Sequence, residues 1–281
     1  MNGKALIVYN PAKESAATVF REMRAWLEDR GFGVSSHDSH RCRTGCGETD
    51  IDFAVSLGGD GTFLSCARLL ADRPVPILPV HLGTFGFITE VTQAEWPDTL
   101  EAWLDGRLEV EERMILDVGI VRGGRLIADF RAVNDAVVNA RGISKVIRLS
   151  LKLGGVEAGR FRGDGLILST ATGSTAYSLA SGGPILVPPM QALVLTPICP
   201  FSLSWRPIVL PGTDATAIRV EQEQRADVLL TVDGQETFPL SEGDVVEMKG
   251  RPSGAKVIKS DKRVFYEVVR SKLGWSGGPH A

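Results

Sequence analysis

The sequence predicts a two-domain chain of the α/β plus all-β class, and three observations predict it. Strand-like and helix-like segments alternate over the first third, and short apolar runs separated by glycine turns follow from about residue 109 to 249. A last amphipathic segment restores the helical pattern. We expect an α/β domain over residues 1–107 and an all-β, β-sandwich-like domain over 108–252. A C-terminal strand and helix over 253–281 should pack back on the first domain and end in a disordered tail.

The first domain is predicted to be a doubly wound parallel sheet, because its strand-length apolar runs alternate with helical segments. Residues 15–30 carry apolar side chains three and four positions apart, which is typical of an amphipathic helix, and Gly31 suits its C-terminal end. We expect strands at 5–9, 32–35, 52–57 and 76–80, and helices at 15–30, 62–70 and 94–104.

The turn Gly58–Thr62 is the feature around which the first domain is organised. It connects a buried strand to a helix, so it lies where open α/β sheets bind ligands. Glycine N–H groups and the first turn of a helix form an anion site suited to phosphate. Asp60, its one charged residue, can accept a proton from an attacking hydroxyl or hold Mg²⁺ that arrives with phosphates. A glycine-rich hairpin is the alternative, but a hairpin would not join a strand to a helix.

The second domain is predicted from short apolar or alternating runs separated by turns such as Gly123-Gly124, Gly154-Gly155 and Asp233-Gly234. This pattern is typical of a sandwich or a closed sheet. The expected strands are 114–121, 126–133, 136–139, 147–153, 166–168, 217–221 and 228–232, followed by a strand at 256–258 and a helix at 262–273.

Three polar stretches of the second domain carry chemistry. Asn134-Asp135 places an amide beside a carboxylate, which suits base edges or ribose hydroxyls, although this pair is also common in turns. Arg162-Gly163-Asp164-Gly165 precedes an apolar strand. Residues 169–178 are crowded with hydroxyls and small side chains that suit a nucleotide, and Tyr177 can lie against a purine.

Composition limits the classes of partner. A net charge of −3 argues against a protein that binds nucleic acid or a membrane surface. The sequence has no run long enough to span a membrane and no signal-peptide pattern. Four cysteines in 281 residues are not a disulfide framework, so we expect a cytoplasmic protein.

One cluster of histidines and cysteines in the first domain is not explained by a purely structural role. His37, His40, Cys42 and Cys46 fall within ten residues. Their spacing differs from that of structural zinc sites, so we interpret the segment as a variable surface loop, with a metal or redox site as the alternative.

Motifs along nearly the whole chain resemble those of NAD kinases. The glycine turn alone is shared with diacylglycerol-type lipid kinases and phosphofructokinases, whereas the stretch 172–177 behind it is specific. The matching motifs are Gly58–Thr62, Val133–Val137, Asp164–Tyr177 with Gly182–Pro184, Thr196–Pro200, Phe201–Pro207, Val232–Gln235 and Lys272–Trp275.

This resemblance implies transfer of a phosphoryl group from ATP, or from polyphosphate, to the 2′-hydroxyl of the adenosine ribose of NAD, giving NADP. It also implies Mg²⁺ or another divalent cation with ATP, and a homodimer or homotetramer. Asp60 matches the catalytic aspartate that accepts the hydroxyl proton. The donor phosphates are assigned to Gly58, Gly59, Gly61 and Thr62. The NAD contacts are Asp60, Gly61, Phe87, Asn134, Asp135, Lys145, Arg162, Asp164, Thr172, Thr175, Ala176, Tyr177, Ser178, Leu179, Ala180 and Gln235.

Two alternatives come from other classes. A lipid kinase would share the glycine turn but would need an apolar groove and not the 172–177 stretch. A non-catalytic NAD(P) sensor would keep the NAD contacts but lose the base, and Asp60 is present. A P-loop mechanism is excluded because the sequence lacks that motif. Thr84-Phe85 stands where Arg-Leu is frequent in the family, which leaves open the choice of NAD against NADH and of ATP against polyphosphate.

Overall fold

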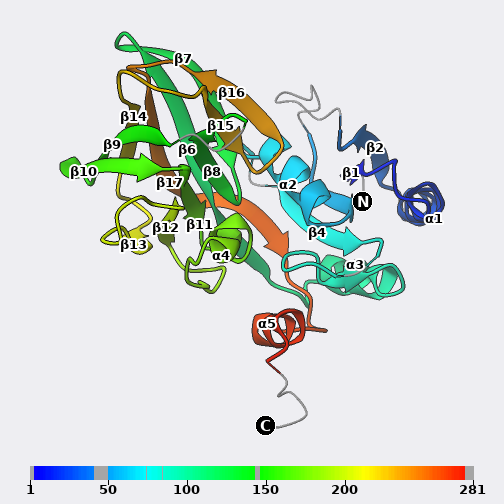
Figure 1. The fold of residues 1–281 in the computed structure, drawn as a ribbon. Helices are drawn as coiled ribbons and strands as arrows, with labels where there is room; N and C mark the ends of the chain where they lie inside the picture. Colours follow the sequence, from blue (N-terminus) through cyan, green and yellow to red (C-terminus); the bar gives the residue numbers. More distant parts are fainter. Residues whose placement is uncertain (1–2, 41–49, 74, 84, 143–145, 276–281) are drawn as a thin grey trace. The chain divides into compact units, whose positions relative to one another are not determined.

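The structure, a computed structural model, describes residues 3–40, 50–73, 75–83, 85–142 and 146–275. The chain forms two compact units. Unit 1 comprises Met1–Glu112 and Ala255–Ala281, and unit 2 comprises Arg113–Gly254. Strands and helices alternate in unit 1, whereas unit 2 consists mostly of strands (Figure 1). The predicted class, an α/β domain followed by a sheet-rich domain, is confirmed.

The sheet of unit 1 is parallel and doubly wound. Its strands lie in the order β2-β1-β3-β4, and both β5 and the end of β17 pair with β4. The chain moves one way from β1 to β2 and the opposite way from β3 to β4, so right-handed crossovers place α1 and α2 on opposite faces. The elements are β1 (Lys4–Tyr9), α1 (Ala16–Asp29), β2 (Gly33–Asp38), β3 (Phe53–Gly58), α2 (Asp60–Leu69), β4 (Pro76–His81), β5 (Val91–Thr92) and α3 (Trp96–Leu104).

One core of unit 1 forms between the sheet and two helices. Buried residues of α1 and α3 pack on alternate residues of β1 and β3, and Trp26 meets Trp96 edge to face at 5.6 Å. The helical spacing predicted this contact face, because residues three and four apart share one side of a helix. The predicted helices begin and end within two residues of α1, α2 and α3.

The C-terminal helix α5 (Phe265–Leu273) belongs to unit 1, as expected. It begins after Arg263, whose guanidinium pairs with Glu95 at 3.0 Å and donates to the Glu90 carbonyl at 2.7 Å. Gly274 ends the helix with φ +68°, a conformation that favours glycine. The predicted tail at 276–281 lies outside the described residues.

Unit 2 contains two sheets. One has the order β10-β9-β14-β17, with β6 pairing β17 and β7, and the other has the order β13-β12-β11-β8-β15-β16. The first set is β6 (Val110–Arg122), β7 (Arg125–Ala132), β9 (Ile147–Leu153), β10 (Val156–Gly163), β14 (Thr216–Val220) and β17 (Val245–Ile258). The second is β8 (Asp135–Ala140), β11 (Gly165–Thr170), β12 (Ala192–Ile198), β13 (Ile208–Pro211), β15 (Val228–Val232) and β16 (Glu236–Leu240).

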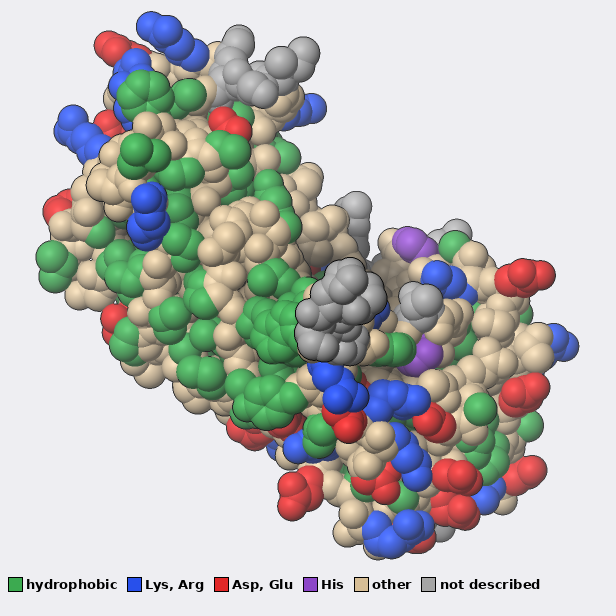
Figure 2. All heavy atoms as spheres, turned by 60° about the horizontal axis from the view of Figure 1, so that its bottom comes forward, with side chains coloured by type: hydrophobic (Ala, Val, Ile, Leu, Met, Phe, Trp, Pro, Cys, Tyr) green, Lys and Arg blue, Asp and Glu red, His purple; other side chains and the backbone are tan. Residues whose placement is uncertain are grey.

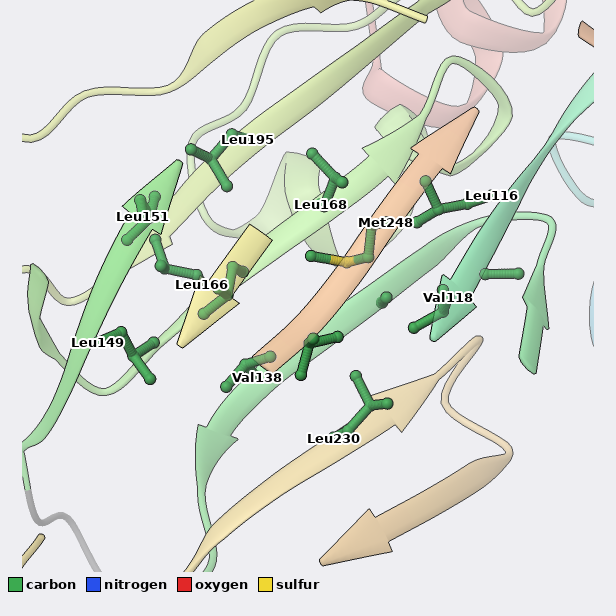
Figure 3. Packing of buried hydrophobic residues seen from close by; sticks show 14 of the residues in the cluster. Leu116, Val118, Val138, Leu149, Leu151, Leu166, Leu168, Leu195, Leu230 and Met248 are labelled. Atoms are coloured by element: carbon green, nitrogen blue, oxygen red, sulfur yellow. The ribbon is translucent and has the colours of Figure 1, made fainter. Parts of the chain in front are cut away.

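The core of unit 2 lies between these sheets. Leu149, Leu151 and Met248 of the first sheet point toward Leu166 and Leu168 of the second (Figure 3). A single buried cluster that draws on both sheets is the packing of a β-sandwich. The predicted alternating runs correspond to strands of this core, because alternate side chains face inward.

Several strands of unit 2 were missed from the sequence. β10 is mostly exposed, β13 is a four-residue edge strand, and β16 contains Pro239. β10 and β16 lack the continuous or alternating apolar pattern on which strand prediction rests, whereas β12 and β13 are apolar and were missed although they carry it. β17 is also longer than the predicted strand at 256–258, since it begins at Val245.

Figure 2 shows charged side chains of both signs together with exposed hydrophobic side chains on the face that it presents. No helix within the described part of the chain is long and apolar enough to cross a membrane. Two cysteines are described as free thiols, Cys66 in the core and Cys199 on the surface.

Candidate active site

The glycine turn joins β3 to α2 as predicted. Gly58 is the last residue of β3, Gly59 is the extended N-cap of α2, and Asp60 is the first helical residue. A Cβ on Gly58 would overlap the side chain of Thr62, so only glycine allows Thr62 to fold back over the strand end. The Thr62 N–H donates to the N-cap carbonyl of Gly59 at 2.9 Å, and the positive end of the helix dipole makes this end of α2 favourable for phosphate.

The Asp60 carboxylate is held by the loop that follows β4. Its Oδ2 accepts the Phe87 N–H at 2.9 Å. Its Oδ1 accepts the N–H groups of Ile88 at 3.3 Å and Thr89 at 3.0 Å, and the Thr89 hydroxyl at 2.9 Å. Four donors fix both the position and the rotation of this carboxylate. Oδ2 has one partner among the described residues, so one lone pair of that oxygen can accept a substrate proton.

Gly86 lets this loop approach. A Cβ at that position would overlap the Asp60 carboxylate, so any larger residue must push the two apart. The loop is supported in turn from its far side: Arg263 holds Glu90 and Glu95, and the Lys272 ammonium lies 4.9 Å from the centre of the Phe85 ring. The hydrogen bonds from Arg263 lower the pKa of Glu95 to about 2.

In unit 2, the turn between β7 and β8 carries Asn134 and Asp135. Asp233 Oδ1 accepts the N–H groups of Val133 at 3.1 Å, Asn134 at 2.8 Å and Asp135 at 3.2 Å. The carbonyl groups of the turn are bonded by Thr170, whose hydroxyl donates to Val133 O at 2.6 Å and whose N–H donates to Asn134 O at 2.8 Å. The turn is buried, and these partners satisfy backbone groups that no strand can reach.

The two side chains of this turn that the sequence analysis singled out have different surroundings. Asn134 Oδ1 is buried and has no hydrogen-bond partner among the described residues, which is costly unless a ligand supplies one. Burial, followed by the charge of Asp233, raises the pKa of Asp135 to about 7. The Asp135 carboxyl is therefore close to half ionised at neutral pH.

The hydroxyl-rich stretch packs against this turn. Thr172–Thr175 form a 3₁₀ turn and Tyr177–Ala180 a short helix, α4. A Cβ on Gly173 would overlap the Asn134 backbone, so glycine permits the contact. Thr172 and Ser178 are buried, whereas Tyr177 is 46% exposed. Ser178 bonds the Thr196 hydroxyl at 2.8 Å, so its side chain serves the packing of α4 against β12.

The other expected NAD contacts lie at separate places in unit 2. Arg162 is exposed on β10, with its guanidinium 5.1 Å from the Phe201 ring. Asp164 follows at the crossing to β11, and Gln235 is exposed in the β15–β16 turn beside Asp233. Lys145 lies outside the described residues, as do Thr84, Cys42 and Cys46.

The structure thus brings the Asn134-Asp135 turn together with the hydroxyl-rich stretch and with Asp233, to which the sequence analysis assigned no site role. Asp233, Thr170, Thr89 and Gly86 position site residues, and none was predicted in that role. The sequence analysis interpreted Asp233-Gly234 as a turn pair within a matched motif and assigned no role to the Asp233 carboxylate. The sequence signal that could have indicated this role was the presence of a carboxylate in the matched motif Val232–Gln235.

The histidine segment offers no metal centre in the part that the structure describes. His40 contacts Asn10 Oδ1 at 3.1 Å through Nε2, and His37 lies on β2. Across the described ranges, no group of three or more His, Cys, Asp or Glu side chains could hold an ion.

Unit 1 is a doubly wound domain with a phosphate-type glycine turn and one held carboxylate. Unit 2 is a β-sandwich with a polar nucleotide-type turn. These features together define a two-domain phosphotransferase without a Walker lysine. The ATP-NAD kinase N-terminal domain family matches residues 38–108, and the ATP-NAD kinase C-terminal domain family matches residues 133–260. The chain belongs to the NAD kinase family.

Sequence relatives align with this chain over nearly its full length. The chain is 43% identical over 276 residues to an NAD kinase of Treponema denticola, covering 98% of this chain and 97% of the relative. It is 40% identical over 276 residues to an NAD kinase of Geobacter sulfurreducens, covering 95% and 96%. These matches exclude the lipid-kinase alternative.

Solved structures share the fold. Yeast NADH kinase complexed with NADH aligns with a TM-score of 0.87 at 23% identity, covering 99% of this chain and 89% of that one. An Archaeoglobus fulgidus NAD kinase in complex with ATP aligns with a TM-score of 0.75 at 25% identity, covering 98% and 100%.

Proposed function

We propose that this protein transfers the γ-phosphoryl group of ATP to the 2′-hydroxyl of the adenosine ribose of NAD, with Asp60 as the general base. The observation that carries the proposal is the fixed Asp60 carboxylate, which keeps one acceptor position on Oδ2 at the start of α2. A ribose hydroxyl is a weak nucleophile, and a carboxylate within hydrogen-bond reach accepts its proton as the new P–O bond forms.

The glycine turn supplies the donor site in this proposal. Gly58, Gly59 and Gly61 let the backbone approach the phosphates, and the N-terminal N–H groups of α2 stabilise the negative charge that develops on them. Thr62 packs under the turn and supports it. The remaining contribution is alignment of the donor with the hydroxyl.

Unit 2 supplies most of the proposed dinucleotide contacts. The unpartnered Asn134 amide oxygen and the Asp135 carboxyl fit donors on a ribose or a base, and exposed Tyr177 fits a purine face. We assign the remaining contacts to Gly61, Phe87, Lys145, Arg162, Asp164, Gln235 and residues 172–180. Ser178 acts there through packing, since its hydroxyl is bonded to Thr196.

Mg²⁺ enters this proposal as part of the substrate Mg-ATP. The described residues place one carboxylate at the donor turn and no cluster able to hold an ion, which does not fit a resident metal site. The ion would neutralise phosphate charge, and every protein group named above acts without binding it.

A coupled assay tests the proposal: purified protein and Mg²⁺ with NAD or NADH as acceptor, and with ATP or polyphosphate as donor, read as formation of NADP(H). NAD with ATP should give product. Asp60→Asn should keep NAD binding by calorimetry and lose at least about 100-fold in kcat, because the amide cannot accept the proton. Near-normal turnover in this variant would remove Asp60 from the base role. NAD binding without product in the wild type would indicate a sensor.

We also propose a cytoplasmic homodimer or homotetramer. The edge strand β13 exposes Ile208 and Val209, near half-exposed in each case, and Phe201 and Leu203 lie exposed just before it. Light scattering of the purified protein tests the assembly, and a monomeric mass at assay concentration would contradict it.

A further inference from the structure

Asp233 is used in an unusual way for a turn residue. The turn Val232–Gln235 is closed by the Gln235 N–H to Val232 O at 2.9 Å, and both central residues have positive φ, +50° for Asp233 and +66° for Gly234. These are the angles of a type I′ turn, where Asn and Gly serve at least as well as Asp. Turn geometry therefore does not require a carboxylate here.

The carboxylate instead binds a segment about one hundred positions away. It accepts the backbone N–H groups of three consecutive residues, Val133 to Asp135, and the Asp233 N–H donates back to Asp135 O at 2.9 Å. Asp233 is 7% exposed, and Asp135 is 5% exposed. Without the carboxylate, three buried N–H groups would lose their acceptor, and the turn could not keep its present path.

We propose that Asp233 is a positioning residue for NAD: its carboxylate holds the Val133–Asp135 backbone so that Asn134 and Asp135 present their side chains to the dinucleotide. The inference rests on the proposed function, since it assumes that these two residues contact NAD. Asp233 itself touches the turn and not the substrate.

Asp233 also acts on Asp135 through its charge. Asp135 begins β8, where its cross-strand neighbour is the uncharged Ser169, and Asp233 is the charged group that raises its pKa. Removing the negative charge of Asp233 should therefore move the ionisation of Asp135 to lower pH. A residue that only stabilised the fold would not shift this ionisation.

Two variants separate the roles, because both are compatible with the turn. Asp233→Asn removes the charge and keeps one acceptor oxygen, while Asp233→Gly removes every acceptor at no cost in backbone strain. We expect the KM for NAD to rise about tenfold in Asp233→Gly and less in Asp233→Asn, with kcat changed by less than about threefold. In Asp233→Asn the midpoint of the pH dependence of this KM should move below that of the wild type.

Asp244→Asn is the matched control. Asp244 is buried at the other end of the β15–β16 hairpin, where it accepts two bonds from Arg122 and the Ser241 N–H at 2.8 Å. Its loss should lower the Tm without shifting the pH midpoint of the KM. Wild-type KM and pH midpoint in both Asp233 variants would overturn the inference, as would an equal KM increase in Asp244→Asn.

Failure of the proposed function gives a different result. If the wild type made no NADP, the proposed activity would be wrong. Calorimetric titration with NAD across pH would then still test Asp233, because the Kd should respond to both variants as the KM does. Unchanged binding in both variants would overturn the positioning role on its own.

Discussion

Two carboxylates of this molecule each accept backbone N–H groups from three consecutive residues, yet their roles are opposite. Asp60 in unit 1 is bonded by Phe87, Ile88 and Thr89, and Asp233 in unit 2 is bonded by the turn Val133–Asp135. In the first case the loop holds the carboxylate that we propose as the general base. In the second the carboxylate holds the turn whose side chains we propose as NAD contacts.

The difference lies in what remains available to a ligand. Asp60 is partly exposed and keeps an acceptor position on Oδ2, whereas Asp233 is buried beneath the turn it holds. Each arrangement also needs a glycine at the contact, Gly86 against the Asp60 carboxylate and Gly173 against the Asn134 backbone. In our proposal the same hydrogen-bond pattern serves catalysis in unit 1 and positioning in unit 2.

Gly86→Ala should have the largest effect after loss of Asp60 itself. The added methyl group overlaps the carboxylate, so the carboxylate or the loop must move, and kcat should fall about 100-fold with a smaller change in the KM for NAD. Gly83→Ala in the same loop is the control, because its methyl group meets open space. Steady-state kinetics of both variants measure the effect, and equal kcat values would contradict it.

Gly173→Ala should weaken NAD binding rather than lower the turnover number. Its methyl group overlaps the Asn134 backbone and displaces the turn that Asp233 and Thr170 hold, so the KM for NAD should rise about tenfold or more. Gly119→Ala, whose methyl group meets the flexible end of Leu126 at 3.0 Å, is the control in unit 2. If kcat fell at unchanged KM, the two regions would not divide the work as described.

The support behind the Asp60 loop predicts a smaller, pH-dependent effect on stability. Arg263 lowers the pKa of Glu95 from 4.5 to about 2, so the ion pair stabilises the fold above about pH 4.5 and is lost as the pH falls toward 2. Arg263→Met should cost on the order of 2 kcal/mol at pH 7, a figure reduced for the partial exposure of both side chains. Urea unfolding at several pH values measures this.

The difference in unfolding free energy between the wild type and Arg263→Met should shrink as the pH is lowered from 5 to 2. Glu95→Gln is a second variant that removes the charge and should flatten the same dependence. A deficit that stayed constant over this range would assign the role of Arg263 to its bond with the Glu90 carbonyl, which does not titrate.

Much of the architecture could be predicted from local pattern. Helical spacing located α1, α2 and α3, and alternating or apolar runs located most strands of the two cores, since both signals come from residues close in the chain. The glycine turn identified the ligand end of β3 for the same reason. The exposed strand β10 was missed because it carries no such pattern, whereas the apolar strands β12 and β13 were missed although they carry it.

The precise site depended on contacts between distant segments. The sequence was sufficient to propose Asp60 as the base and Asn134-Asp135 as NAD contacts, because residue type and motif indicate chemistry. It did not indicate that residues 86–89 would enclose Asp60, or that Asp233 would hold a turn about one hundred positions earlier. Buried backbone groups must find partners wherever the fold places them, and that choice is made by three-dimensional proximity and not by sequence spacing.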